Sequence, residues 1–272
     1  MKSIEGFLDG IVPERGDAAS DGDAPLTWAD VLVVDSAANG RTQSQRGGGA
    51  RWTHRRCPAC RGGERDTRTG KTCACVPVVR TAWRLTLARI PYELAHHGCA
   101  EGTRFDDGRS YAHAEGPGYL SEAANAWCDT WARGAKGPRL VGNTGAYKSS
   151  RACASTQRLI MRGVSARFVA WSAWLADYRD AIGRDADQHA ARARITEPEV
   201  VWLDDIGREH ATDWTREQLS LVLQERLDGK RTVALTTNLD DAALADYLGD
   251  RLWSRVRGAT SVAHVVGTDG RR

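Results

Sequence analysis

The sequence lacks any long run of apolar residues, and this absence argues against a protein that spans a membrane. None of its apolar stretches approaches the roughly 20 residues that a membrane-spanning helix needs. Its first ten residues carry one lysine and two acids and contain no apolar core of the signal-peptide type. We also find no internal repeat. We therefore expect a soluble, cytoplasmic protein with no membrane partner.

Cysteine is scarce outside one short segment. Four of the seven cysteines lie between Cys57 and Cys75, whereas Cys99, Cys128 and Cys153 are scattered and odd in number, which is typical of a reducing compartment. The 272 residues are enough for one large core, or for one core with a small accessory module. An apolar share of 41% and a charged share of 27% are ordinary for a globular protein.

The four clustered cysteines have a spacing that suits a metal ion. Cys57, Cys60, Cys73 and Cys75 form the pattern C-x2-C-x12-C-x-C. Two close pairs of thiolates can complete a tetrahedral Zn²⁺ site, and such a site can fold a module too small for a core of its own. We predict a zinc site on these four residues, with His54 as a replacement ligand. The alternatives are an iron–sulfur cluster and free cysteines.

Charge is distributed unevenly along the first third of the chain. Residues 1–35 carry eight acids and two bases, whereas residues 51–90 carry ten bases and two acids. A basic block of this kind often faces nucleic acid, and the alternative is a solvated, arginine-rich surface. The segment 37–50 ends in three glycines and an alanine and is typical of a linker.

From residue 123 onward, apolar stretches alternate with helix-like stretches. The predicted strands are 139–141, 166–170, 200–203, 232–235 and 261–266. The predicted helices are 123–133, 149–162, 171–182, 215–227, 240–248 and 250–257, with a further helix within 79–95 that ends near Pro91. Strands that alternate with helices indicate a parallel sheet covered on both faces.

A glycine-rich segment between the strand 139–141 and the next helix has the pattern of a phosphate-binding loop. It consists of Gly142, Asn143, Thr144, Gly145, Ala146, Tyr147, Lys148 and Ser149. Backbone amides of such a loop and of the following helix N-terminus point at phosphates. Lys148 would neutralise the β- and γ-phosphates of ATP, and Ser149 would bind Mg²⁺. The alternative is an ordinary glycine-rich turn.

The residue before the lysine departs from the usual pattern G-x-x-x-x-G-K-[ST]. Glycine normally stands there so that the backbone and a phosphate can approach closely, but this chain has Tyr147. The tyrosine could adopt a workable backbone with its side chain turned outward, or it could weaken nucleotide binding. We therefore predict nucleotide binding more firmly than hydrolysis.

Two acids follow the buried strand 200–203. Burying the carboxylates of Asp204 and Asp205 at the edge of a sheet costs free energy, so their presence there indicates a function. Asp204 would hold Mg²⁺ through water, and Asp205 would orient or deprotonate the attacking water. The alternative is that an aspartate caps the next helix.

Further polar residues follow the next predicted strand. Asn238 could reach the same edge of the sheet and hydrogen-bond the γ-phosphate or the water, although turn chemistry explains it equally well. Arg251, Arg255 and Arg257 lie on one short segment. Arginine stabilises charge on a transferring phosphoryl group and is often supplied by a neighbouring subunit, whereas the alternative is a solvated basic helix.

These motifs in this order resemble the DnaC/DnaI/IstB-type AAA+ proteins, which are bacterial replicative-helicase loaders and their transposition-helper relatives. The resemblance runs from about Ile90 to the C-terminus and rests on GNTGAYKSS, VVWLDDIGRE, TDWTREQLSLVLQERLDGKRTVALTTNL and LGDRLWSRVRG. It implies an α/β fold of the P-loop NTPase (AAA+) type, with a parallel sheet flanked by helices. The organisation that we predict is a poorly ordered acidic N-terminus and linker at 1–50, a four-cysteine zinc module at 51–80, and the ATPase core at 88–272.

The resemblance also implies roles for individual residues. Lys148 and Ser149 match the phosphate and Mg²⁺ positions, Asp204 and Asp205 the Walker B pair, Asn238 the sensor-one residue, and Arg255 the trans-acting arginine, with Arg251 as second candidate. The implied function is ATP-dependent loading or remodelling of a replicative DNA helicase, with self-association through the ATP site and contact with single-stranded DNA. The alternatives are a transposase-helper ATPase acting on duplex DNA, and a non-hydrolysing adaptor in which Tyr147 closes the site.

Overall fold

The computed structural model describes residues 33–35, 51–53, 57–61, 63–91, 94–95, 104–105, 122–183, 188–208 and 212–265. The predictions for residues 1–32 and 36–50, for His54 and for Cys99 lie outside these described residues. Among the helices that the structure describes, none is long and apolar enough to cross a membrane.

A five-stranded parallel sheet forms the centre of the structure. In space its strands follow the order β5 (Ala166–Ala170), β6 (Val200–Ile206), β7 (Thr232–Thr237), β4 (Gly137–Val141) and β8 (Thr260–His264). All four neighbouring pairs are parallel, with Phe168 opposite Trp202 and Arg139 opposite Leu235. The carboxyl ends of β4, β6 and β7 therefore meet at one edge of the sheet.

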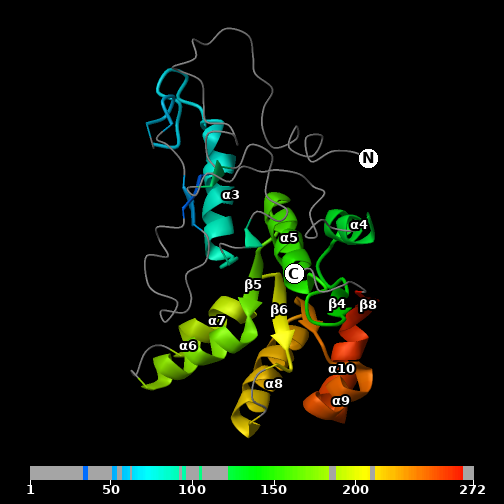
Figure 1. Cartoon of the computed structure of the whole chain (residues 1–272). Coiled ribbons are helices and arrows are strands. Elements are labelled where there is room, and N and C mark those ends of the chain that lie inside the picture. Colours follow the sequence, from blue (N-terminus) through cyan, green and yellow to red (C-terminus); the bar gives the residue numbers. More distant parts are fainter. Residues whose placement is uncertain are drawn as a thin grey trace.

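Helices cover both faces of this sheet, as Figure 1 shows. One layer contains α3 (Cys75–Leu87), α4 (Glu122–Thr130) and α5 (Lys148–Met161); the other contains α6 (Trp171–Gly183), α7 (Gln188–Thr196), α8 (Asp213–Asp228), α9 (Asp241–Leu248) and α10 (Asp250–Ala259). Alternate residues of β6 point into opposite layers, because Trp202 packs with the first layer and Leu203 with the second. The predicted P-loop type of α/β fold, with helices on both faces, is confirmed.

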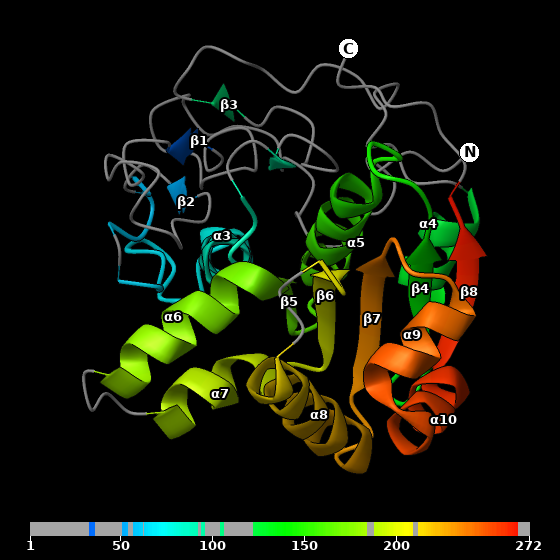
Figure 2. The same ribbon diagram turned by 60° about the horizontal axis from the view of Figure 1, so that its bottom comes forward.

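Helix α3 connects the cysteine segment to the edge of the sheet (Figures 1 and 2). Its buried residues Val78 and Leu85 belong to the same apolar cluster as Phe168 of β5. The backbone N–H of Phe168 donates to the carbonyl of Ala88 at 3.0 Å, so the turn after α3 covers the outer side of the edge strand β5. A second, three-stranded sheet contains β1 (Val33–Asp35), β2 (Arg51–Thr53) and β3 (Arg104–Phe105), and β2 contacts α3.

Most predicted elements occur near their predicted positions, and the differences have local causes. The strands predicted at 200–203 and 232–235 continue through Ile206 and Thr237, because the polar side chains at their ends find partners at the sheet edge. Helix α3 begins at Cys75, with Pro77 in its first turn, where proline is tolerated. Helix α7 has no counterpart among the predicted elements, since it carries only one long apolar residue, Ile195.

Candidate nucleotide site and cysteine cluster

The predicted phosphate-binding loop connects β4 to α5 at the carboxyl edge of the sheet. Helix α5 begins at Lys148, directly after the loop, and its first turn contains no acid. The amides of this first turn and the positive end of the α5 dipole therefore face the loop and favour an anion there. Gly145 has a φ of 84°, a backbone conformation that glycine adopts without strain.

Lys148 joins this loop to the segment that follows β7. The lysine is buried, and its Nζ donates to the carbonyls of Gly142 and Asn143, each at 2.8 Å. The same Nζ donates to Oδ1 of Asn238 at 2.6 Å, and Nδ2 of Asn238 donates to the hydroxyl of Thr144 at 3.4 Å. The loop and the predicted sensor residue are thus in direct contact, although they are far apart in the sequence.

Asp204 is the buried member of the acidic pair. The Thr236 hydroxyl donates to its Oδ1 at 2.7 Å, and Ser149 hydrogen-bonds the same side chain. Burial raises the pKa of Asp204 to about 6; the hydrogen bonds from Thr236 and Ser149 oppose this shift, and so does the charge on Lys148. Carboxylate and hydroxyl oxygens are the ligands that Mg²⁺ prefers. The side chains of Ser149 and Asp204 therefore fit a magnesium ion.

Asp205 has a different environment from its neighbour. It lies in an irregularity of the β6–β7 ladder and has a φ of 63°, which is unusual for a residue other than glycine. Its backbone N–H donates to the Thr236 hydroxyl at 2.9 Å, and its partly exposed carboxylate accepts from Nη1 of Arg208 at 2.9 Å. The two acids therefore differ in burial, and the separate tasks predicted for them stay a prediction.

Tyr147 adopts a left-handed backbone conformation, which glycine favours. Its φ of 57° and ψ of 29° lie in the left-handed region, and it directly precedes α5. That region costs a residue with a Cβ roughly 1–2 kcal/mol. The loop therefore retains a glycine-like path at the expense of strain in one residue.

The two predicted arginines lie on α10, on the other layer of the fold. Nη2 of Arg255 donates to Oδ1 of Asp228 at the end of α8, at 2.5 Å, and Arg251 is exposed. The hydrogen bonds of Lys148 and Asp204 described above involve neither of these two arginines of the same chain. Their action across a subunit interface stays a prediction.

Three residues near the site carry contacts that the sequence motifs do not assign. Thr236 bridges the two acids, and the signal for it is a hydroxyl in a strand whose residues are all buried. Arg208 follows the acids within the same motif, but the motif gives it no role. Arg139 of β4 is buried, pairs with Asp241 of α9, and has its guanidinium carbon 4.8 Å from the ring centroid of Trp253 on α10. No local pattern predicts that contact.

Comparison with known protein families places this chain in one of them. Residues 124–259 match the family described as IstB-like ATP binding protein. The chain belongs to this family. The IstB-like match spans the loop, both acids, Asn238, and the arginines Arg251 and Arg255 of α10. Among curated proteins, none matches the sequence.

Several solved structures resemble this IstB-like protein. The DnaC helicase loader is 21% identical, with a TM-score of 0.49 over 53% of this chain and 86% of that one. DnaI is 22% identical, with a TM-score of 0.45 over 54% and 80% of the two chains. Domain III of the replication initiation protein DnaA from Thermotoga maritima is 17% identical, with a TM-score of 0.48 over 58% and 66%.

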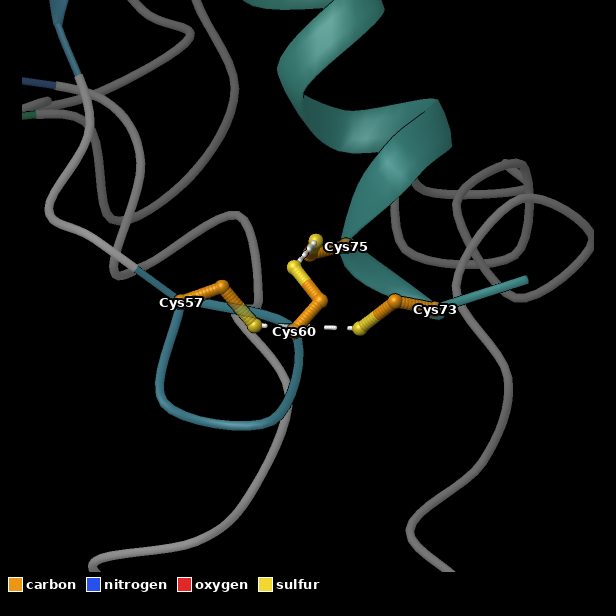
Figure 3. Close-up of side chains that lie close together, drawn as sticks. All are labelled: Cys57, Cys60, Cys73 and Cys75. Carbon is orange, nitrogen blue, oxygen red and sulfur yellow. Dashed lines mark hydrogen bonds between the residues drawn. The ribbon is translucent and has the colours of Figure 1, made fainter. Parts of the chain in front are cut away.

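The four clustered cysteines lie before the residues that match the IstB-like family. Figure 3 shows Cys57 and Cys60 on one turn facing Cys73 and Cys75, which lies at the start of α3. All four Sγ atoms lie within 4.8 Å of one another, with Cys57 and Cys73 separated by 3.7 Å and Cys60 and Cys75 by 3.5 Å. The segment between the pairs folds back on itself through an antiparallel bridge between Arg65 and Thr72.

These sulfur positions fit one tetrahedral ion. A disulfide needs about 2.05 Å between sulfurs, so the four residues are thiols here. Zinc–sulfur bonds of about 2.3 Å in a tetrahedron place the sulfurs about 3.8 Å apart, close to the separations observed. The predicted gathering of four buried cysteines is confirmed. The module boundary predicted at residue 80 stays a prediction, and α3 runs across it.

Proposed function

We propose that this IstB-like protein binds ATP with Mg²⁺ at the carboxyl edge of β4, β6 and β7 and hydrolyses it to load or remodel a replicative DNA helicase. The nucleotide part of the proposal is carried by one observation. Lys148, Ser149, Asp204 and Asn238 come from three separate segments and converge through the hydrogen bonds described above. Such a group of a lysine, a hydroxyl, an acid and an amide suits a phosphate chain with its metal ion.

Each residue has a task in this proposal. The amides of the loop and of the first turn of α5 hold the phosphates, together with Lys148. Ser149 and Asp204 hold Mg²⁺, which neutralises charge on the phosphates when it is bound. Asp205 orients the attacking water and accepts its proton, and Asn238 hydrogen-bonds the γ-phosphate or the water. Arg255, or Arg251, of a neighbouring protomer stabilises the transferring group, which requires self-association.

Nucleotide binding and turnover test this part directly. We expect wild-type protein to bind ATP, Lys148→Ala to lose binding, and Asp205→Asn to bind but not hydrolyse. Undetectable ATP binding by the wild type would refute the proposal. If the wild type binds ATP without hydrolysing it and Tyr147→Gly restores hydrolysis, the non-hydrolysing adaptor is favoured. The reason is that the strained Tyr147 is the residue by which this loop departs from the usual phosphate-binding pattern.

The partner is proposed from the order of the motifs, which is that of helicase loaders. A second candidate is a transposase-helper ATPase that acts on duplex DNA. The IstB-like family match supports this candidate as much as it supports a helicase loader. Tagged full-length protein recovered from its own cells distinguishes the two. A co-purifying hexameric helicase supports the first candidate, and a transposase supports the second and overturns the first.

A further inference from the structure

The outward side of α3 presents an unusual set of side chains to solvent. Trp83 is 63% exposed, more than any other large apolar residue of the described part of the chain, and Leu87 is also exposed. Residues 80, 83, 84 and 87 recur at helical spacing and form one stripe, opposite the buried Val78 and Leu85. Tryptophan in this position contributes little to the core, so its exposure points to a binding role.

The neighbours of Trp83 on this stripe are basic. Arg80 and Arg84 stand on the helix turn that carries it, and both are exposed. Arg80 lies 3.9 Å from Glu64 in an exposed ion pair, a kind that contributes little energy. Nη1 of Arg84 donates to the carbonyl of Gly163 at 3.1 Å, which orders this side chain beside the tryptophan. Residues 57–91 together carry seven bases and two acids.

Three more arginines interact electrostatically near the end of α3. The hydrogen bond between Phe168 and Ala88 holds the turn after α3 against β5, and so brings Arg89 to Arg167 of β5. Arg194 of α7 completes the group. Burial lowers the pKa of Arg167 to about 10, and repulsion from the charges of Arg89 and Arg194 acts in the same direction. A bound anion would relieve that repulsion.

We propose that this surface, the α3 face, binds single-stranded nucleic acid. It comprises Arg80, Trp83, Arg84 and Leu87 with the arginine group Arg89, Arg167 and Arg194. The arginines contact phosphates along the strand, and a base stacks on Trp83 and Leu87. A single strand fits better than a duplex, because paired bases keep their flat faces inside the stack. The inference adds to the proposed function a surface for single-stranded nucleic acid, on residues that lie outside the nucleotide site.

The test uses the full-length chain and a labelled oligothymidylate of about 20 nucleotides, followed by fluorescence anisotropy without ATP. We expect Trp83→Ala to weaken binding roughly tenfold at unchanged salt dependence, and Trp83→Phe to retain most of the affinity. Arg80→Ala should flatten the dependence of log affinity on log salt by about 0.7, because it removes one phosphate-binding charge. Ile182→Ala removes an exposed apolar side chain from α6 and Arg133→Ala removes an exposed base elsewhere, so both serve as matched controls that bind like the wild type.

Three outcomes would overturn the α3 face. They are wild-type protein that does not bind the oligonucleotide at low salt, equal affinities of wild type and Trp83→Ala, and a duplex of equal length bound as tightly as the single strand. If Trp83→Ala instead changes only the oligomeric mass or the recovered protein partner, the face is a protein interface and the inference is wrong. ATP binding measured in parallel separates the two proposals. Trp83-dependent oligonucleotide binding without ATP binding would refute the proposed ATPase and leave the α3 face standing.

Discussion

The hydroxyl of Thr236 offers a sharp test of how the acidic pair is held. Thr236→Val keeps the shape of the side chain but removes the bond donated to Asp204 and the bond accepted from the N–H of Asp205. The adjacent Thr237→Val also removes one donated bond, to the carbonyl of Ile206, and one accepted bond, from the N–H of Leu239. Both threonines are buried. The two substitutions are therefore matched in the number and burial of the hydrogen bonds that they remove, and they differ in that only Thr236 donates to a carboxylate.

The expected magnitudes follow from these hydrogen bonds. Each substitution leaves buried polar groups without a partner and should lower the free energy of unfolding by about 2 kcal/mol, measured by urea denaturation. Only Thr236→Val disturbs the acids. Loss of a group that orients a metal ligand typically weakens metal binding about 10- to 100-fold, so we expect Mg²⁺-dependent ATP affinity to fall by that factor in Thr236→Val alone. Thr236→Ser keeps the hydroxyl and should bind as the wild type does.

The assay compares ATP affinity with and without Mg²⁺ for the three variants. Without Mg²⁺, Lys148 and the loop amides hold the phosphates, so Thr236→Val and wild type should differ little. Equal losses of Mg²⁺-dependent affinity in Thr236→Val and Thr237→Val would show that only the integrity of β7 matters. An unchanged Mg²⁺ effect in Thr236→Val would refute the role of its hydroxyl altogether.

Three other predictions concern strain, a buried charge and the thiols. Tyr147→Gly removes roughly 1–2 kcal/mol of left-handed strain but adds about 0.5–1 kcal/mol of unfolded-chain entropy, so thermal denaturation should show a gain in stability of up to about 1.5 kcal/mol. A loss of stability would contradict this prediction, and Gly145→Ala, at φ 84°, should destabilise the protein. Asp241→Asn leaves the buried Arg139 without its carboxylate and should lower the free energy of unfolding by about 2 kcal/mol. This loss is smaller than that for a fully buried pair, because the Asp241 side chain is 53% exposed. Asp246→Asn, at an exposed residue, should have no measurable effect on stability, and equal effects of the two substitutions would refute the reasoning. Elemental analysis of purified protein should find about one zinc ion per chain. The Cys60→Ser variant should lose the zinc, and the Cys153→Ala variant should keep it. A metal-free wild type, or iron in place of zinc, would contradict the zinc site.

Much of the nucleotide site could be predicted because its parts are local patterns placed by one general rule. A glycine-rich loop before Lys148 and two acids after an apolar strand are each recognisable alone. Parallel strands bring their carboxyl ends to one edge, and this places Asp204 beside the loop without any knowledge of contacts. The contact between Lys148, which follows β4, and Asn238, which follows β7, is a consequence of that rule.

The parts that could not be predicted depend on contacts between distant segments. Arg139 meets Asp241 across 102 residues, and its own neighbourhood in the sequence resembles any short strand. Thr236 lies in a strand that is buried throughout, so its hydroxyl had to find a partner, but the sequence did not say which. Helix α7 escaped prediction because an amphipathic pattern needs several apolar residues and this helix has one long one.

The cysteines share their apolar cluster with Phe168 of the edge strand β5 and Trp202 of the neighbouring strand β6. Ligand binding to the folded state stabilises it by about 2.7 kcal/mol when the ligand is present at 100 times its dissociation constant. If the thiols hold zinc as we propose, that free energy is shared with the nucleotide-binding core. Metal supply would then set how much intact protein a cell maintains, because chains made without zinc would populate unfolded forms that proteases remove.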